Sequence, residues 1–193
     1  MNEELEQLIQ EVKSILPWLL AAGIVVAGYH GVRKYMADRR AAAAEAVANA
    51  YTTEELEDAA AKFKGSKAEG VLRLRLAKSY FDSANYDSAL EIYESFKDKA
   101  PDGFEGVPAV GKAQCLEALG KFDEARTAFD AFAEANEKSF LALTAKLGSA
   151  RCIAQAGDRA KAIEALEALK TSVGDDVQPA VQVNKSQWTK RVT

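Results

Sequence analysis

The side chains of this chain that could take part in covalent chemistry are few and widely separated. His30 is the only histidine, and Cys115 and Cys152 are the only cysteines. The sequence has no Gly-rich phosphate loop, no nucleophile elbow and no histidine after residue 30 to act as a general base. The two cysteines lack the paired spacing of a zinc site. We therefore expect no catalytic residue, no metal site and no cofactor, and we interpret both cysteines as buried small hydrophobic residues rather than a redox pair.

Composition and charge narrow the class of protein. The chain has 193 residues, of which 48% are hydrophobic and 28% are charged, a balance typical of a globular protein. Its net charge of −4 argues against a nucleic-acid-binding surface, and no small-molecule substrate is apparent. Only four prolines and 12 glycines occur, and no run of alternating β-branched residues is present. The sequence therefore predicts an all-α fold.

An uncharged apolar run near the start of the chain predicts a single transmembrane helix. Residues 14–32 contain no Asp, Glu, Lys or Arg, and as a helix they would span about 28 Å, close to the thickness of a bilayer core. Trp18 and Tyr29 lie near the two ends, where aromatic rings favour the membrane interface, and Pro17 would lie in the first turn. A short acidic tail, residues 1–13, precedes the run and argues against a cleaved signal peptide. The alternative is a buried helix of a soluble core.

Small residues recur on one face of this predicted helix. Gly23, Ala27 and Gly31 are spaced four residues apart, which would let another membrane helix approach closely. We expect the ring of His30 to be solvated at the membrane interface rather than to act as a ligand or base.

The segment after the apolar run, residues 33–66, predicts a helical stem. Its first part, RRAAAAEAVANA, is rich in strong helix formers and would prolong the membrane helix outward. Thr52 and Glu55 follow with the three-residue spacing of a capping box, which marks the start of a second helix that would close at Gly65.

Three similar blocks follow the stem at a period of 36 or 37 residues. Each has an alanine in its first helix, a small residue in its turn, and a second-helix alanine followed four residues later by a large apolar side chain. Small residues at these positions would allow two antiparallel helices to approach closely. The second-helix alanines are Ala89, Ala125 and Ala162, so that successive spacings are 125 − 89 = 36 and 162 − 125 = 37. The corresponding turn residues are Ala84, Gly120 and Gly157, and the first-helix alanines are Ala77, Ala113 and Ala150.

At these residues the chain resembles tetratricopeptide repeats, which place small, aromatic and alanine residues at a similar spacing. The resemblance implies a solenoid of helical hairpins, with three repeats over residues 67–174. Lys112, Ser149 and Arg159 depart from the pattern, because apolar or aromatic residues are expected there. We expect residues 175–193 to form a C-terminal helix that caps the last repeat.

The order of these parts, from the acidic tail and apolar run to the stem and the three repeats, resembles the YfgM-like family, ancillary subunits of the bacterial Sec translocon. The resemblance implies a single-pass protein of the bacterial inner membrane whose repeats lie outside the cytoplasm. It also implies contacts with translocon subunits, chaperones or emerging client polypeptides, so that the protein would be a membrane-anchored scaffold for protein–protein interaction. Two alternatives remain: an enzyme whose site is completed by a partner protein, and a repeat adaptor that faces the cytoplasm.

The basic residues around the apolar run disagree with this orientation. Lys13 precedes the run, whereas Arg33, Lys34, Arg39 and Arg40 follow it. Taken alone, the positive-inside rule would keep the repeats in the cytoplasm. We nevertheless expect exported repeats, because the resemblance covers the chain whereas the charge rule rests on a few side chains.

One side of the three first helices predicts a binding groove for a protein partner. An apolar strip with a few polar edges suits a partner helix or an extended hydrophobic segment. The alternative is that the strip is core, covered by the stem helix at 54–64. The predicted groove residues are Val71, Leu74, Lys78, Phe81, Val107, Val110, Gln114, Glu117, Leu147, Arg151 and Gln155.

Overall fold

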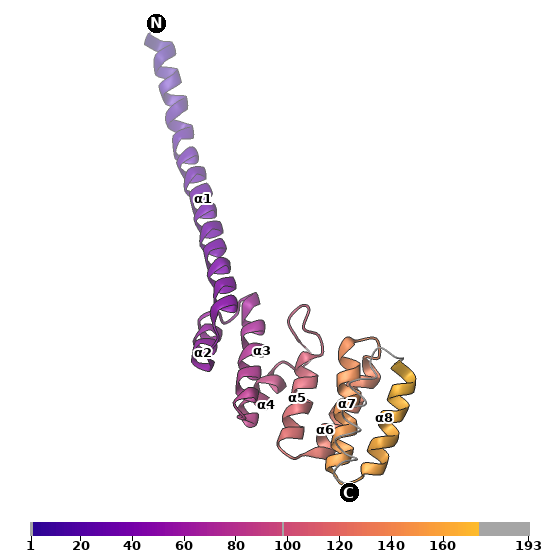
Figure 1. Ribbon diagram of the computed structural model, residues 1–193. Coiled ribbons are helices and arrows are strands. Elements are labelled where there is room, and N and C mark those ends of the chain that lie inside the picture. The colour runs from indigo at the N-terminus through magenta and orange to yellow at the C-terminus, as the bar shows by residue number, and fades with distance from the viewer. Residues whose placement is uncertain (1, 98, 174–193) are drawn as a thin grey trace. The chain divides into compact units, whose positions relative to one another are not determined.

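The computed structural model describes residues 2–97 and 99–173, and every regular element in these ranges is an α-helix (Figure 1). The predicted all-α class is therefore confirmed. The predicted capping helix at 175–193 lies outside the described residues. The chain divides into two compact units, residues 1–49 and residues 50–193. The described helices are α1 (Asn2–Asn49), α2 (Thr53–Lys62), α3 (Lys67–Asp82), α4 (Tyr86–Ser95), α5 (Val107–Ala118), α6 (Phe122–Ala135), α7 (Phe140–Gln155) and α8 (Arg159–Val173).

The first unit is a single helix, α1, of 48 residues. It runs without interruption through the predicted tail, the apolar run and the first part of the stem, because residues 2–13 are themselves rich in helix formers such as Glu, Leu and Gln. Pro17 therefore lies inside the helix rather than in its first turn, which corrects the placement expected from the sequence. Large apolar side chains between Leu16 and Met36 are exposed, including Trp18 at 77% and Ile24 at 73%.

The second unit begins with α2 and the capping box that the sequence predicts. The N–H of Glu55 donates to Thr52 Oγ1 (3.2 Å), and the N–H of Thr52 donates to the Glu55 carboxylate (3.1 Å). Backbone N–H groups of Tyr51 and Thr52 lower the pKa of Glu55, because they favour its ionised form. The helix buries Leu56 and Ala59, and it packs against α3 alone among the described helices.

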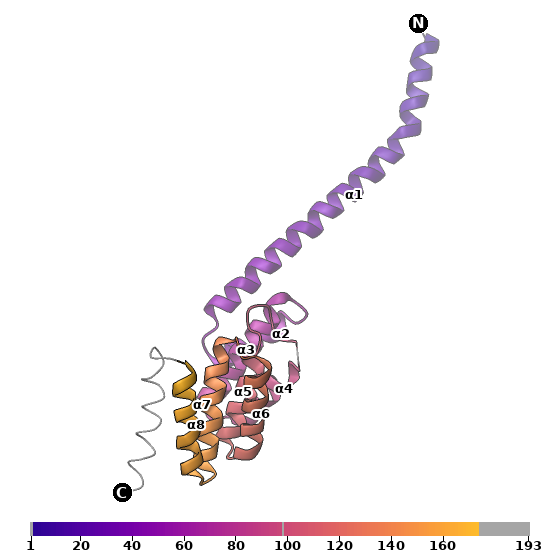
Figure 2. The same cartoon turned by 90° about the vertical axis from the view of Figure 1, so that its right-hand side faces the viewer.

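Six helices form three hairpins, α3–α4, α5–α6 and α7–α8, which stack in chain order (Figures 1 and 2). Each helix packs against the next along the chain, and the first helices of neighbouring hairpins also meet, α3 with α5 and α5 with α7. No such contact joins α4 to α6 or α6 to α8 within the described part of the chain. The first helices therefore lie together on one side of a solenoid, as the repeat pattern implies.

The three hairpin turns share one backbone geometry. In the first turn, the N–H of Ala84 donates to the Phe81 carbonyl (3.0 Å) and the N–H of Asn85 donates to the Tyr80 carbonyl (2.9 Å). These two bonds form a Schellman motif, which places the residue at the position of Ala84 in the left-handed conformation. The corresponding bonds close the other two turns. The left-handed residues are the three predicted turn residues, Ala84 (φ 59°), Gly120 (φ 75°) and Gly157 (φ 106°).

The repeat alanines are buried within the hairpins. All six are at most 2% exposed, as expected for small residues where paired helices approach each other. Their burial agrees with the predicted register of the three repeats. These alanines are Ala77, Ala113 and Ala150 in the first helices and Ala89, Ala125 and Ala162 in the second helices.

Neighbouring hairpins are joined by an aromatic ring that lies against a glycine. A Cβ atom added to Gly111 in α5 would lie 2.5 Å from Cζ of Tyr93 in α4. A Cβ atom added to Gly148 in α7 would lie 2.6 Å from the ring of Phe129 in α6. The two glycines are equivalent, because 148 − 111 = 37 is the repeat spacing. The same joint, an aromatic ring packed against a glycine, therefore connects both pairs of neighbouring hairpins.

The first hairpin has no glycine at the equivalent position. Arg75 stands there, since 111 − 75 = 36, and its Nη2 donates to the Ala50 carbonyl (2.6 Å). Its Cζ lies 6.0 Å from the centroid of the Tyr51 ring. Arg75 thus connects α3 to the segment that leads into α2 instead of receiving a ring from a preceding hairpin.

Candidate functional site

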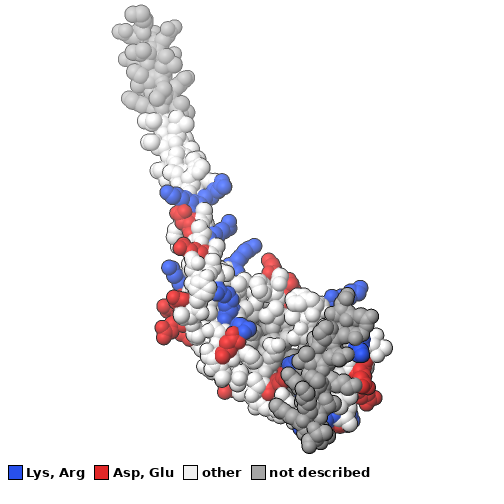
Figure 3. Space-filling model, viewed as in Figure 1, with Lys and Arg blue, Asp and Glu red and all other residues white. Residues whose placement is uncertain are grey.

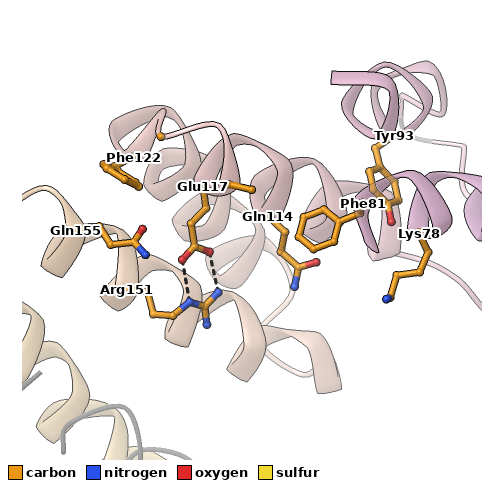
Figure 4. Close-up of a pocket in the computed structure, with 10 residues that line it drawn as sticks. Lys78, Phe81, Tyr93, Gln114, Glu117, Phe122, Arg151 and Gln155 are labelled. Atoms are coloured by element: carbon orange, nitrogen blue, oxygen red, sulfur yellow. Dashed lines mark hydrogen bonds and ion pairs between the residues drawn. The ribbon is translucent and has the colours of Figure 1, made fainter. Parts of the chain in front are cut away.

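An open pocket of about 630 Å³ crosses the side of the solenoid that the first helices form (Figure 4). Its polar lining comes from α3, α5 and α7, one helix of each hairpin. These polar residues are Lys78, Gln114, Glu117, Arg151 and Gln155. Its aromatic lining is Phe81 of α3, Tyr93 of α4 and Phe122 of α6.

The repeat places one polar side chain from each first helix at the same position. Lys78, Gln114 and Arg151 are separated by 114 − 78 = 36 and 151 − 114 = 37 residues, the spacings of the buried alanines. Each directly follows a buried first-helix alanine, so the packing of that alanine fixes where its neighbour emerges. The solenoid therefore builds a row of three polar groups along the pocket.

A bidentate ion pair lies in the middle of the pocket and links two hairpins. Arg151 donates from Nε to Glu117 Oε1 (2.9 Å) and from Nη2 to Glu117 Oε2 (2.8 Å). The Glu117 side chain is 12% exposed and that of Arg151 is 31% exposed, so both groups are largely removed from water. Hydrogen bonding to Glu117 raises the pKa of Arg151 and outweighs the opposing effect of burial. The pair fixes the spacing of α5 and α7 at this point.

The other cation of the pocket is also neutralised by the protein itself. Lys78 Nζ forms an ion pair with the carboxylate of Asp82, one turn later in α3, with a distance of 2.6 Å to Oδ2. Both side chains are more than half exposed, so this pair contributes little to stability. The pocket consequently offers no uncompensated charge to a ligand from either Lys78 or Arg151.

Aromatic rings form the apolar part of the pocket. Phe81 meets Tyr86 edge to face, with ring centroids 5.2 Å apart. Burial raises the pKa of Tyr93 to about 12, so its hydroxyl stays protonated at neutral pH. Phe122 is the first residue of α6 and reaches the pocket from the hairpin turn.

The structure brings six of the eleven predicted groove residues into this pocket. The six are Lys78, Phe81, Gln114, Glu117, Arg151 and Gln155. The other five, which are all apolar, do not line it. Leu74 and Val110 are 5% and 4% exposed and belong to the clusters between the helices, and Val107 and Leu147 pack against such clusters. Val71 is partly buried away from the pocket.

The predicted groove is therefore less apolar than expected, because its aliphatic members are buried or partly buried outside the pocket. The surface that remains carries polar and aromatic side chains. The stem helix does not cover the strip on the second and third hairpins, because α2 packs against α3 alone among the described helices. Tyr93 and Phe122 also line the pocket, and neither is among the predicted groove residues, although both belong to the repeat pattern.

Both cysteines are free and fully buried, as the sequence predicts. Burial raises the pKa of Cys115 to about 11 and that of Cys152 to about 12. Each thiol therefore stays protonated at neutral pH and lacks the thiolate that a nucleophile or redox pair requires.

The small residues of α1 have no described neighbours. A Cβ atom at Gly23 or Gly31 would meet no atom within 4 Å, and the role of these glycines and of Ala27 in packing against another helix stays a prediction. His30 is exposed and meets the Tyr29 ring edge to face, with centroids 5.8 Å apart.

The described residues contain neither a helix suited to span a membrane nor a cluster suited to bind a metal. None of their helices combines the length and the apolar character needed to cross a membrane, so the transmembrane helix predicted at 14–32 is not confirmed. The same residues contain no group of three or more His, Cys, Asp or Glu side chains placed to hold a metal ion.

Comparison with protein families agrees with the architecture. The family model described as a tetratricopeptide repeat-like domain matches residues 29–139, more than half of the 193 residues. The match ends where α7 begins, yet the third hairpin repeats the turn and the buried alanines of the first two. Comparisons with curated proteins and with solved structures gave no match. The chain belongs to the tetratricopeptide repeat-like domain family.

Proposed function

We propose that this protein is a membrane-anchored scaffold that binds a segment of another protein in the pocket across its repeats. Stacked repeats of this kind create extended concave surfaces that suit protein–protein interaction. The observation that carries the proposal is the lining of the pocket, which combines aromatic rings, amide side chains and charges that are already paired (Figure 4).

The chemistry of the pocket favours an extended segment with apolar side chains and little charge. Phe81 and Phe122 provide apolar surface for such side chains, and the amides of Gln114 and Gln155 can donate to and accept from a peptide backbone. Arg151 is already bound to Glu117, so an acidic segment would have to displace an internal ion pair. A nascent or unfolded client chain fits these requirements better than a strongly charged tail.

Attachment to a membrane is proposed from the first unit. Large apolar side chains of α1 between Leu16 and Met36 are exposed, and an exposed apolar surface of this extent calls for a lipid or protein environment. In Figure 3 the part of α1 that adjoins the grey atoms carries no charged side chain, and basic side chains follow it. We propose that residues 14–32 cross the membrane once.

The partners and the location are proposed from the resemblance to the YfgM-like family. They would be translocon subunits, chaperones or emerging client polypeptides at the bacterial inner membrane, with the repeats outside the cytoplasm. Both the concave pocket and the apolar segment of α1 are compatible with a protein that holds such chains close to the membrane.

Site-specific photocrosslinking in intact cells tests the proposal. A photoactivatable phenylalanine analogue would replace Gln114 or Gln155 in the full-length protein, and the same analogue at Glu124 or Glu164, exposed residues of the second helices, serves as the control. We expect crosslinks to translocon subunits, chaperones or client chains from the two pocket positions only. Equal crosslinking from both sets of positions would contradict binding in the pocket.

A further inference from the structure

A second pocket, of about 570 Å³, lies where the start of α3 meets the end of α4. It is separate from the pocket across the first helices, and no residue lines both. Its charged lining is Arg73, Lys97, Lys99 and Glu69, and two serines, Ser66 and Ser95, add hydroxyl groups.

The cations of this pocket are not neutralised by the described part of the chain. Arg73, Lys97 and Lys99 form no ion pair with any described carboxylate. Glu69 lies one turn before Arg73, but its carboxylate accepts a bond from the N–H of Gly65 (2.6 Å) instead. The described lining of the pocket therefore contains three cations and one carboxylate.

Ion pairs occur elsewhere in the repeats. Five cations pair there with a carboxylate within 4 Å, at distances that reach 3.5 Å. These are Lys78, Lys112, Arg126, Arg151 and Lys161. What distinguishes the second pocket is that three cations without a described ion pair line one cavity.

Arg73 is held in place before any ligand arrives. Its Cζ lies 5.2 Å from the centroid of the Phe96 ring, and its Nη2 donates to Ser95 Oγ. Ser95 Oγ in turn donates to the Ile92 carbonyl (2.5 Å). One edge of the guanidinium is thereby fixed, and a planar fork held in this way suits the bidentate recognition of an oxyanion.

Two further features of the pocket are unfavourable in the protein alone. Lys97 follows the end of α4 in the left-handed conformation (φ 49°), where glycine or asparagine is preferred. Ser66 Oγ is buried and has no hydrogen-bond partner, although Thr52 and Ser139, the corresponding residues at the starts of α2 and α7, each accept a backbone N–H. An unsatisfied buried hydroxyl is costly and is commonly explained by a missing ligand or water.

We propose that this second pocket binds a phosphate monoester group. A phosphate monoester carries about −1.5 to −2 charges at neutral pH, so it interacts with several cations at once more strongly than a singly charged carboxylate does. Its three oxygens can engage the Arg73 fork, the two lysines and the Ser66 hydroxyl. Soluble phosphate esters and the headgroups of some lipids both present this group. This site goes beyond the proposed protein scaffold and does not depend on it.

Calorimetric titration of the full-length protein with inorganic phosphate tests the site, with acetate as the comparison anion. The Lys97→Asn/Lys99→Gln variant removes two charges, and asparagine tolerates the backbone conformation of residue 97. We expect it to weaken phosphate binding at least about tenfold. The Lys121→Gln/Lys138→Gln variant removes two exposed charges outside the pocket and should bind phosphate like the parent. Ser66→Ala should weaken phosphate binding while it raises the unfolding temperature of the free protein.

Lipid vesicles test whether the bound phosphate group belongs to a lipid headgroup or to a soluble ester. Hydrogen exchange at residues 66–73 would be compared in phosphatidylcholine vesicles with and without phosphatidic acid. Protection that requires phosphatidic acid and is lost in Lys97→Asn/Lys99→Gln assigns the site to a headgroup, whereas protection by inorganic phosphate alone assigns it to a soluble ester. Three results would overturn the proposal: no effect of either probe, equal weakening in the Lys121→Gln/Lys138→Gln control, or acetate bound as tightly as phosphate.

Discussion

The ring of Tyr93 lies so close to Gly111 that a single added methyl group could not fit between them. A Cβ atom at residue 111 would stand 2.5 Å from Tyr93 Cζ, well inside van der Waals contact. Phe129 and Gly148 repeat this relationship one hairpin later, at 2.6 Å. These contacts connect separate hairpins, so they help to hold the solenoid together as one unit.

Alanine at either glycine should destabilise the protein. Alanine is the better helix former, but here its methyl group would overpack a buried ring, so we expect Gly111→Ala and Gly148→Ala each to lower the free energy of unfolding by about 1–3 kcal/mol. Chemical denaturation followed by circular dichroism measures this. Tyr93→Leu should relieve part of the effect of Gly111→Ala, and strictly additive effects of the two changes would contradict the proposed clash.

Substitutions at equivalent positions of two hairpin turns should change the stability of the protein in opposite directions. Gly120 is left-handed with open space around it, so Gly120→Ala adds only backbone strain and should cost about 1 kcal/mol. Ala84 already bears this strain, and Ala84→Gly should stabilise the protein by up to about 1 kcal/mol. Thermal unfolding of the two variants checks the pair. A loss of stability in both would mean that the turns are not equivalent.

The contributions of Glu117 and Arg151 to the stability of the protein should be coupled through their ion pair. Its two charge-assisted bonds are largely shielded from water, so a double-mutant cycle with Glu117→Gln and Arg151→Met should give a coupling of about 1–2 kcal/mol. Arg126 and Asp130 provide the control, because their pair is longer (3.5 Å) and about half exposed. Its coupling should not exceed about 0.5 kcal/mol. Similar values for the two cycles would show that the pair in the pocket has no special strength.

Membrane attachment predicts resistance to alkaline extraction. The full-length protein should stay in the membrane pellet after a carbonate wash, because the exposed apolar side chains of α1 would be buried in lipid. A chain that starts at Ala46 lacks this segment and should remain in the supernatant. Release of the full-length protein by the wash would exclude residues 14–32 as a membrane span.

Orientation can be tested with one added cysteine. Lys138 is exposed in the turn between α6 and α7, whereas Cys115 and Cys152 are fully buried, so an impermeant maleimide should label a Lys138→Cys variant selectively. Exported repeats predict labelling on intact spheroplasts. Labelling that appears only after lysis would place the repeats in the cytoplasm. The parent protein, with its two native cysteines, is the control for background labelling.

The sequence predicts the repeats well because their determinants are local. A small residue in a turn and an alanine at each helix crossing recur at a fixed spacing, and the structure places Ala84, Ala89 and their equivalents as expected. The pocket was harder to predict, because the exposure of Leu74 or Val110 depends on how the next hairpin packs, some 36 residues away. Gly111 and Gly148 were visible as a repeated pair, but only the rings opposite them explain why glycine is needed.

The joint between hairpins also gives the array a direction and sets its length. The middle hairpin alone carries both halves of the joint, Gly111 at its start and Phe129 toward its end. In the first hairpin, Arg75 stands at the position of the glycine that would accept a ring from a preceding hairpin. In the third hairpin, Leu166 stands at the position of the aromatic residue that would pack against a following hairpin. Exchanging the first and third hairpins would therefore leave both junctions unmatched, whereas a duplicated middle hairpin could be inserted in tandem. Among the described hairpins, the middle one is thus the unit whose two junctions would both be matched in a longer array.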